Sequence, residues 1–102
     1  MIREGFWSRD PNAQPWPVAN IAPWEGQEDF LADLMRVEAR VIPLSFRGWS
    51  NCRLCSKPNG SREYRTDDAE WPEGLWHYVA DHNVKPSQEF VDYIAERASE
   101  VR

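Results

Sequence analysis

The stretch SNCRLCSKPNGSREY, residues 50–64, contains the only two cysteines of this 102-residue chain, Cys52 and Cys55. A C-x-x-C pair followed by a Pro/Gly turn is typical of a zinc knuckle, because the turn directs both thiolates toward one point. The dipeptide Asn59–Gly60 is a hairpin turn signal, and SREYRT after it has the composition of a returning strand. The stretch therefore predicts a β-hairpin that carries half of a metal site.

The only two histidines, His77 and His82, follow in the segment WHYVADH. Their H-x-x-x-x-H spacing lies within the range common in two-Cys two-His zinc sites. Five helical residues turn the chain by about 500°, so both rings reach one ion only if the helix end tightens or unwinds near His82. We predict that Cys52, Cys55, His77 and His82 bind one structural zinc ion. Two alternatives remain: buried thiols with a core His77 and a surface His82, or a redox C-x-x-C pair.

The fold class that this arrangement predicts is small α+β. Cysteines on a hairpin and histidines on the next helix give a ββα zinc-finger-like core, expected within residues 44–83. The gap of 21 residues between Cys55 and His77 exceeds the ~12 of a DNA-reading finger. Pro72 is expected at the first helical position, and Asn83 near the helix end. The acidic residues expected near the start of this helix are Asp67, Asp68, Glu70 and Glu73.

Two further helices follow from hydrophobic spacing. Over residues 25–41, Phe30, Leu34, Val37 and Val41 recur at helical intervals and predict an amphipathic N-terminal helix that Pro43 stops. Residues 87–101 predict a C-terminal helix that Ser87 caps. The apolar face of this last helix consists of Phe90, Val91, Ile94, Ala98 and Val101.

Residues 1–23 predict an irregular, extended arm, because prolines interrupt it repeatedly and its tryptophans recur every eight or nine residues. Disordered tails carry few aromatic residues, so these indoles need a surface on which to lie. That surface is either the core of this chain or a partner protein. The candidate partner contacts are Trp7, Trp16 and Trp24.

Composition limits the class of protein. The length fits a single domain, residues 1–102. No run of apolar residues is long enough for a membrane span or a secretory signal, so we expect a cytoplasmic protein without a disulfide. The net charge of −5 argues against nucleic-acid binding by the whole surface. Residues 46–65 are nevertheless locally basic, with Glu63 as their one acidic residue; the basic residues are Arg47, Arg53, Lys57, Arg62 and Arg65.

Residues 46–94 resemble a pattern of small bacterial and phage-type proteins. The shared features are the cysteine pair, the Asn–Gly turn, the W-P-E-G-L stretch, the H-Y-V…H pair and the Val-x-Pro after it. This resemblance implies a zinc-supported fold and no particular biochemical role. It does not extend to residues 1–45.

The functional prediction is a non-enzymatic zinc protein that acts through contacts with another protein, as an accessory or inhibitory factor. Four Cys/His ligands close a zinc site, whereas a catalytic zinc keeps a position open. A first alternative is nucleic-acid binding through the basic residues of 46–65, with Trp49 and Tyr64 as stacking groups. A second is a small structural subunit of a larger assembly such as a virion. The sequence does not specify the oligomeric state.

Overall fold

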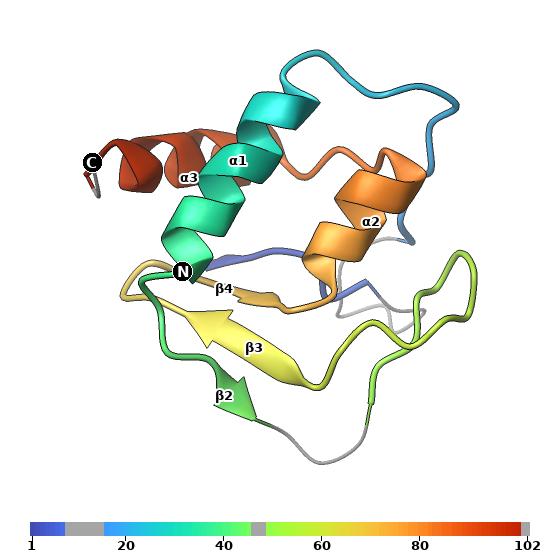
Figure 1. Cartoon of the computed structure of the whole chain (residues 1–102), viewed down its shortest axis with the longest axis horizontal. Helices are drawn as coiled ribbons and strands as arrows, with labels where there is room; N and C mark the ends of the chain where they lie inside the picture. The colour runs from blue at the N-terminus through green and yellow to red at the C-terminus, as the bar shows by residue number, and fades with distance from the viewer. Residues whose placement is uncertain (8–15, 46–48, 101–102) are drawn as a thin grey trace.

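The computed structural model describes residues 1–7, 16–45 and 49–100, and within them a mixed β-sheet forms the base of the molecule (Figure 1). Its strand order is β1-β4-β3-β2. The strands are β1 Ile2–Arg3, β2 Leu44–Ser45, β3 Arg62–Arg65 and β4 Ala69–Pro72. The β1 and β4 strands run parallel, and the other neighbours are antiparallel.

Helices gather on one face of this sheet (Figure 1). In the described part of the chain they are α1 Gln27–Glu38, α2 Leu75–His82 and α3 Gln88–Glu100. The predicted small α+β class is therefore confirmed. None of these helices has the length and apolarity that crossing a bilayer requires.

The core lies between the sheet and the helices. Trp71 of β4 is fully buried, and its ring meets the ring of Phe90 of α3 edge-on at 5.5 Å. Phe30 of α1 also packs against Phe90, with ring centroids 6.1 Å apart. The helical spacing of α1 and α3 buries Leu34 and Ile94 in the same cluster. Aromatic contacts of this kind add specific geometry to the burial of apolar area.

The helix that carries the histidines was expected to begin at Pro72, and this prediction was wrong. Ala69–Pro72 form strand β4, and helix α2 begins only at Leu75. Ala69 and Trp71 are buried while Glu70 and Pro72 are half-buried, which is the two-residue alternation of a strand. Pro72 pairs with Glu63 at the end of β4 and is not the first helical residue. The first turn of α2 contains no acidic residue, and of the four expected acids only Glu73, next to the N-cap Gly74, lies near its start; Asp67, Asp68 and Glu70 lie further away in the chain.

The expected ββα zinc-finger-like unit, in which the cysteine hairpin leads directly into the histidine helix, is not confirmed. Strands β3 and β4 occupy the gap between Cys55 and His77, and they belong to the central sheet. The long spacing between the cysteines and the histidines follows from this insertion, since a whole antiparallel strand pair separates them.

Helix α1 spans Gln27–Glu38, inside the expected range of 25–41, with Gly26 as N-cap in the left-handed region at φ 88°. Val41 therefore lies beyond the helix, and Met35 on its outer side is exposed.

Asn83 ends α2 in the left-handed conformation, as predicted. Ser87 accepts the Phe90 N–H at 3.2 Å, the bond expected of an N-cap of α3. Val101 lies outside the described residues.

The N-terminal arm begins as part of the sheet, because Ile2 and Arg3 form β1 on the edge of β4. Trp7 is then buried and meets the ring of Tyr78 edge-on at 4.7 Å. Trp24 is half-buried, and its indole N–H donates to the carbonyl of Val84 at 3.1 Å. Trp16 remains 40% exposed. The prolines at 11 and 15 lie outside the described residues.

Candidate metal centre

The cysteines lie at the tip of a narrow hairpin between β2 and β3. Ser50 donates to the carbonyl of Gly60 at 2.8 Å, and Cys52 donates to the carbonyl of Lys57 at 2.8 Å. The tip closes where the N–H of Ser56 donates to the carbonyl of Cys52 at 2.9 Å, with Ser56 at φ 65°. We refer to residues 50–60 as the knuckle.

The prediction that Asn59–Gly60 form the turn of this hairpin is therefore wrong. A two-residue hairpin turn of this type needs positive φ at both residues, and in this pair only Gly60 has it, at 118°. Asn59 instead lies in the returning leg, where its N–H donates to the carbonyl of Ser50 at 2.9 Å. Gly60 leaves room for Glu73, whose Oε1 would lie 2.3 Å from an added Cβ.

Helix α2 carries the two histidines to the knuckle, and it ends directly after His82. Residues of the N-terminal half hold this helix end. The N–H of Asn20 donates to the carbonyl of His82 at 3.0 Å, and Gln27 donates to the carbonyl of Val79 at 3.0 Å. The helix stays regular through His82, so the reach of the two side chains, rather than unwinding, brings the rings to a centroid distance of 5.0 Å.

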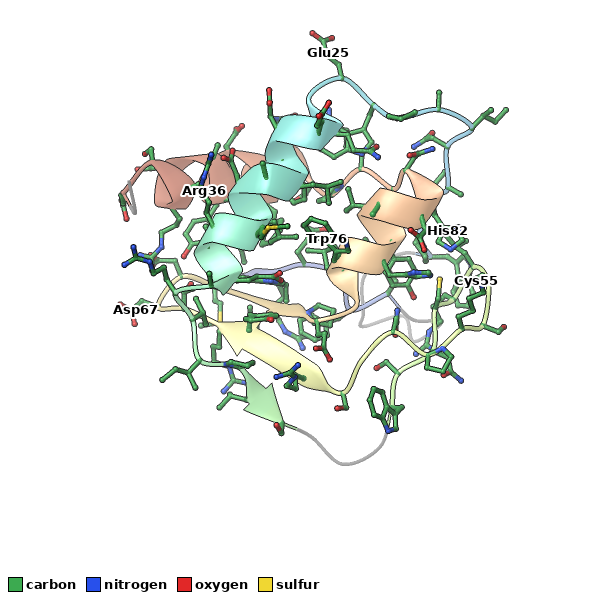
Figure 2. All side chains as sticks on the ribbon, in the orientation of Figure 1. Glu25, Arg36, Cys55, Asp67, Trp76 and His82 are labelled. Atoms are coloured by element: carbon green, nitrogen blue, oxygen red, sulfur yellow. The ribbon has the colours of Figure 1, made fainter. Side chains whose placement is uncertain are left out.

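All four predicted ligands converge. One ligand atom from each of Cys52, Cys55, His77 and His82 lies within 4.8 Å of the others. Figure 2 shows Cys55 and His82 on the same side of the molecule, with Cys55 on the knuckle and His82 at the end of α2. The Sγ of Cys55 is 3.3 Å from Nε2 of His77. Ligand atoms around a tetrahedral zinc ion are about 3.3–3.8 Å apart, as its bond lengths require. The group is therefore close enough to hold a metal ion after a small contraction.

Both histidines are prepared for a metal. The Nδ1 of His77 lies 2.9 Å from a carboxylate oxygen of Asp81, one helical turn later. A carboxylate at this position orients the ring and leaves Nε2 free to bind, as in many histidine–metal sites. The Nε2 of His82 is buried without any hydrogen-bond partner in the described structure. A buried nitrogen is rarely left unpaired, and a metal ion would give this atom the partner that the described residues do not.

The first cysteine is the most enclosed ligand, since Cys52 is 2% exposed. Burial raises the pKa of its thiol above the ordinary value, although the N–H of Leu54, 3.4 Å from Sγ, opposes part of this change. A redox-active cysteine needs a lowered pKa instead. A metal ion binds the thiolate and displaces the proton. The raised pKa therefore gives no sign that Cys52 is an activated redox thiol, and a metal ion would have to displace its proton.

Two of the described basic residues of 46–65 are paired with carboxylates. Arg62 pairs with Glu73 at 3.0 Å. Arg65 bridges Glu63 and Glu70 across the strands, at 3.7 and 3.1 Å. Two of the predicted phosphate contacts are thus neutralised by carboxylates, and Arg47 lies outside the described residues.

The remaining two, Arg53 and Lys57, have no carboxylate partner among the described residues. Arg53 reaches the carbonyls of Trp7 and Asn51 at 3.4 and 3.2 Å. It lines a hollow of about 380 Å³ together with Trp49, which is 72% exposed. Tyr64 does not line this hollow, because it stacks on Trp71 at 5.7 Å. The structure therefore does not bring the two predicted stacking residues together.

Sequence reasoning missed two polar residues that the structure makes prominent. Asp81 had an available signal, namely its four-residue spacing from His77 on one helix. No sequence signal marked Glu38, because the residues around it come from β3, β4 and α2 as well as from its own helix α1.

The sequence profile of a family described as a domain of unknown function (DUF7919) matches residues 17–95. No curated protein and no solved structure matches the chain. The matched range contains all four candidate ligands and α1 to the middle of α3. Because the match covers most of its length, the chain belongs to the DUF7919 family.

Proposed function

We propose that Cys52, Cys55, His77 and His82 form a structural zinc site, and that the chain is a non-enzymatic binding module that contacts another protein. The observation that carries the metal assignment is the convergence of the four ligand atoms, together with the unpartnered, buried Nε2 of His82. Two thiolates and two imidazoles are a donor set that suits tetrahedral zinc.

A structural role for the metal is supported by the ligand count and by the enclosure of the site. Four protein ligands leave no position for a substrate or for an activated water. Cys52 is buried, and the other three side chains are half-buried. The site therefore fits an ion that fastens the knuckle to α2.

A protein partner is supported by apolar side chains on the segment that precedes α1. Val18 and Ile21 are 72% and 106% exposed, and Trp16 is 40% exposed. Exposed apolar residues that lie close together often mark sites of protein contact. Tryptophan in particular contributes strongly to binding energy at such interfaces. The segment 16–21 is thus one candidate contact surface of an accessory or inhibitory factor.

The metal assignment is tested by native mass spectrometry with elemental analysis of the purified full chain. We expect one zinc ion per chain, and replacement by cobalt should give the visible absorption of a tetrahedral thiolate–imidazole site. Cys52→Ser should lose the ion, while the matched control Lys57→Ala, in the same knuckle but without a ligand atom, should retain it. A wild-type protein with freely reactive thiols and far less than one metal ion per chain would disprove the assignment.

A further inference from the structure

A second polar site lies away from the cysteines, in a hollow of about 360 Å³ bounded by α1, α2 and β3. Figure 2 shows Trp76 between α1 and α2, above the strands. The residues that line this hollow are Met35, Glu38, Ala39, Tyr64 and Trp76. We call it the Glu38 hollow.

The carboxylate of Glu38 is only half satisfied by the protein. Its Oε2 accepts the indole N–H of Trp71 at 2.9 Å. Its Oε1 has no hydrogen-bond partner among the described residues, and no described Lys, Arg or His forms an ion pair with Glu38. Burial, together with the negative charge of Glu73, raises the pKa of Glu38 to about 7. A cation placed beside this half-buried carboxyl would strongly stabilise its ionised form.

The other residues that line the hollow also suit a cation. Tyr64 stacks one face of its ring on Trp71 and is half-buried, and the indole of Trp76 is half-buried as well. Aromatic faces attract ammonium groups, and a nearby carboxylate strengthens the attraction. Met35, which is 59% exposed, adds a flexible apolar rim for the methylene groups of a long side chain.

The charged groups around Glu38 also favour a cation. Burial raises the pKa of Tyr64, the negative charges of Glu38 and Glu73 raise it further, and Arg62 lowers it. Arg62 is already paired with Glu73, so it does not neutralise Glu38. The chain as a whole carries a net charge of −5. Local and overall charge therefore both complement a basic partner.

We propose that the Glu38 hollow receives a lysine side chain of a partner protein, with its ammonium group between Glu38, Tyr64 and Trp76. The proposal rests on the proposed function as a protein-binding module, and it specifies the chemistry of the partner. The lysine ammonium donates to Oε1 of Glu38, and its methylene groups lie along Met35. The occupant is a protein segment rather than a free amine because the hollow opens at an exposed helix surface that includes Met35 and Ala39.

The test is a titration of the zinc-loaded full chain at pH 8, followed by ¹H–¹⁵N NMR. The probe is the capped peptide acetyl-Gly-Gly-Lys-Gly-Gly-amide, and its neutral counterpart has norleucine in place of lysine. We expect the lysine peptide to shift the indole signal of Trp76 and the amide of Tyr64. The norleucine peptide should bind at least about tenfold more weakly, since it has neither the ion pair nor the cation–π contact.

Binding of the lysine peptide to variants and at several pH values tests whether Glu38 is the group that it contacts. Glu38→Gln should weaken binding of the lysine peptide at least about tenfold, while the matched control Glu25→Gln, an exposed glutamate before α1, should not change it. Binding should weaken as the pH falls from 8 to 6, because Glu38 takes up a proton as the pH falls through its pKa of about 7. Saturating lysine peptide should lower the titration midpoint of the Glu38 carboxyl carbon.

Equal binding of the two peptides, or unchanged binding in Glu38→Gln, would overturn the lysine proposal. Shifts confined to residues outside the Glu38 hollow would overturn it as well. Because the titration uses protein already shown to contain zinc, a negative result leaves the zinc site intact. A chain that binds no zinc, in contrast, disproves the proposed structural site whatever the peptides do.

Discussion

The knuckle and the helical core are stabilised in different ways. Within residues 50–60, Cys52 is the only buried side chain, and the rest are half-buried or exposed. The core contains Leu34, Trp71, Phe90 and Ile94, all of them essentially inaccessible to solvent. Apolar burial therefore holds the core together, whereas the knuckle has fewer buried side chains and depends more on its hairpin hydrogen bonds and, on the proposed assignment, on a metal ion.

Helix α2 joins these two regions and belongs to both. Leu75 and Val79 are buried in the core, while His77 and His82 face the knuckle. The helix has a reason to form even without a metal, because its apolar side is already covered. On the proposed metal assignment, the ion would fasten a hairpin to an existing helix, in contrast to small zinc fingers that unfold entirely without metal.

The largest expected effect comes from removing the metal. Metal binding contributes about 10–16 kcal/mol in zinc-finger peptides, where it is coupled to folding. We expect a chelator, or Cys52→Ser, to leave the knuckle without stable structure while α1, α3 and the sheet remain folded. Hydrogen exchange measures this directly: the amides of Ser50, Cys52 and Asn59, which are hydrogen-bonded in the hairpin, should lose their protection.

The matched control for this result is a core substitution. Phe90→Ala should lower the free energy of unfolding by about 3–5 kcal/mol and reduce protection throughout the sheet and helices. A chelated protein that loses protection everywhere, as Phe90→Ala does, would show that the two regions are not separately stabilised.

A smaller effect is expected from Glu38, a half-buried acid at the edge of the core whose pKa is strongly raised. Glu38 has a pKa of about 7 in the folded protein against 4.5 for the ordinary group. Because the folded value is the higher one, its favourable contribution is complete below pH 4.5 and is lost as the pH rises to 7 and above. Glu38→Gln should therefore stabilise the protein by about 1–3 kcal/mol at pH 8 and have little effect at pH 4.5.

Denaturant unfolding at several pH values, in the presence of zinc, measures this difference. Glu25→Gln is again the control, since that side chain is exposed. If the advantage of Glu38→Gln were the same at pH 4.5 and pH 8, the carboxyl would not be the group that titrates.

The smallest effect is expected beside the metal, at Asp81. Asp81→Asn preserves the size of the side chain but weakens its hold on Nδ1 of His77. Loss of such an orienting carboxylate costs about 10–100-fold in metal affinity. Competition with a chromophoric chelator measures the change, and the core should keep its stability. An affinity equal to that of the wild type would show that the His77 ring is held in place without Asp81.

Regular spacing was the most dependable guide to the helices. The apolar positions of α1 and α3 recur at helical intervals, and Phe30, Leu34, Phe90 and Ile94 are indeed buried. Ser87 and Asn83 have side-chain or backbone preferences that act within a few residues, so their positions at helix ends were predictable. Local rules failed at Pro72 and Asn59, where pairing with the neighbouring strand β3 or packing against Gly74 at the start of α2 decided the conformation.

The sequence by itself determined which metal ligands are available, since it contains two cysteines and two histidines and no others. It also determined the helical faces, because a periodicity of 3.6 residues is a local property of the chain. Only the tertiary structure decided that four residues from two distant segments meet within 4.8 Å. It alone also placed the half-buried Glu38 beside Tyr64 and Trp76, with no ion-pair partner among the described residues. Both results depend on contacts between segments far apart in the chain, and such contacts leave no periodic signal in the sequence.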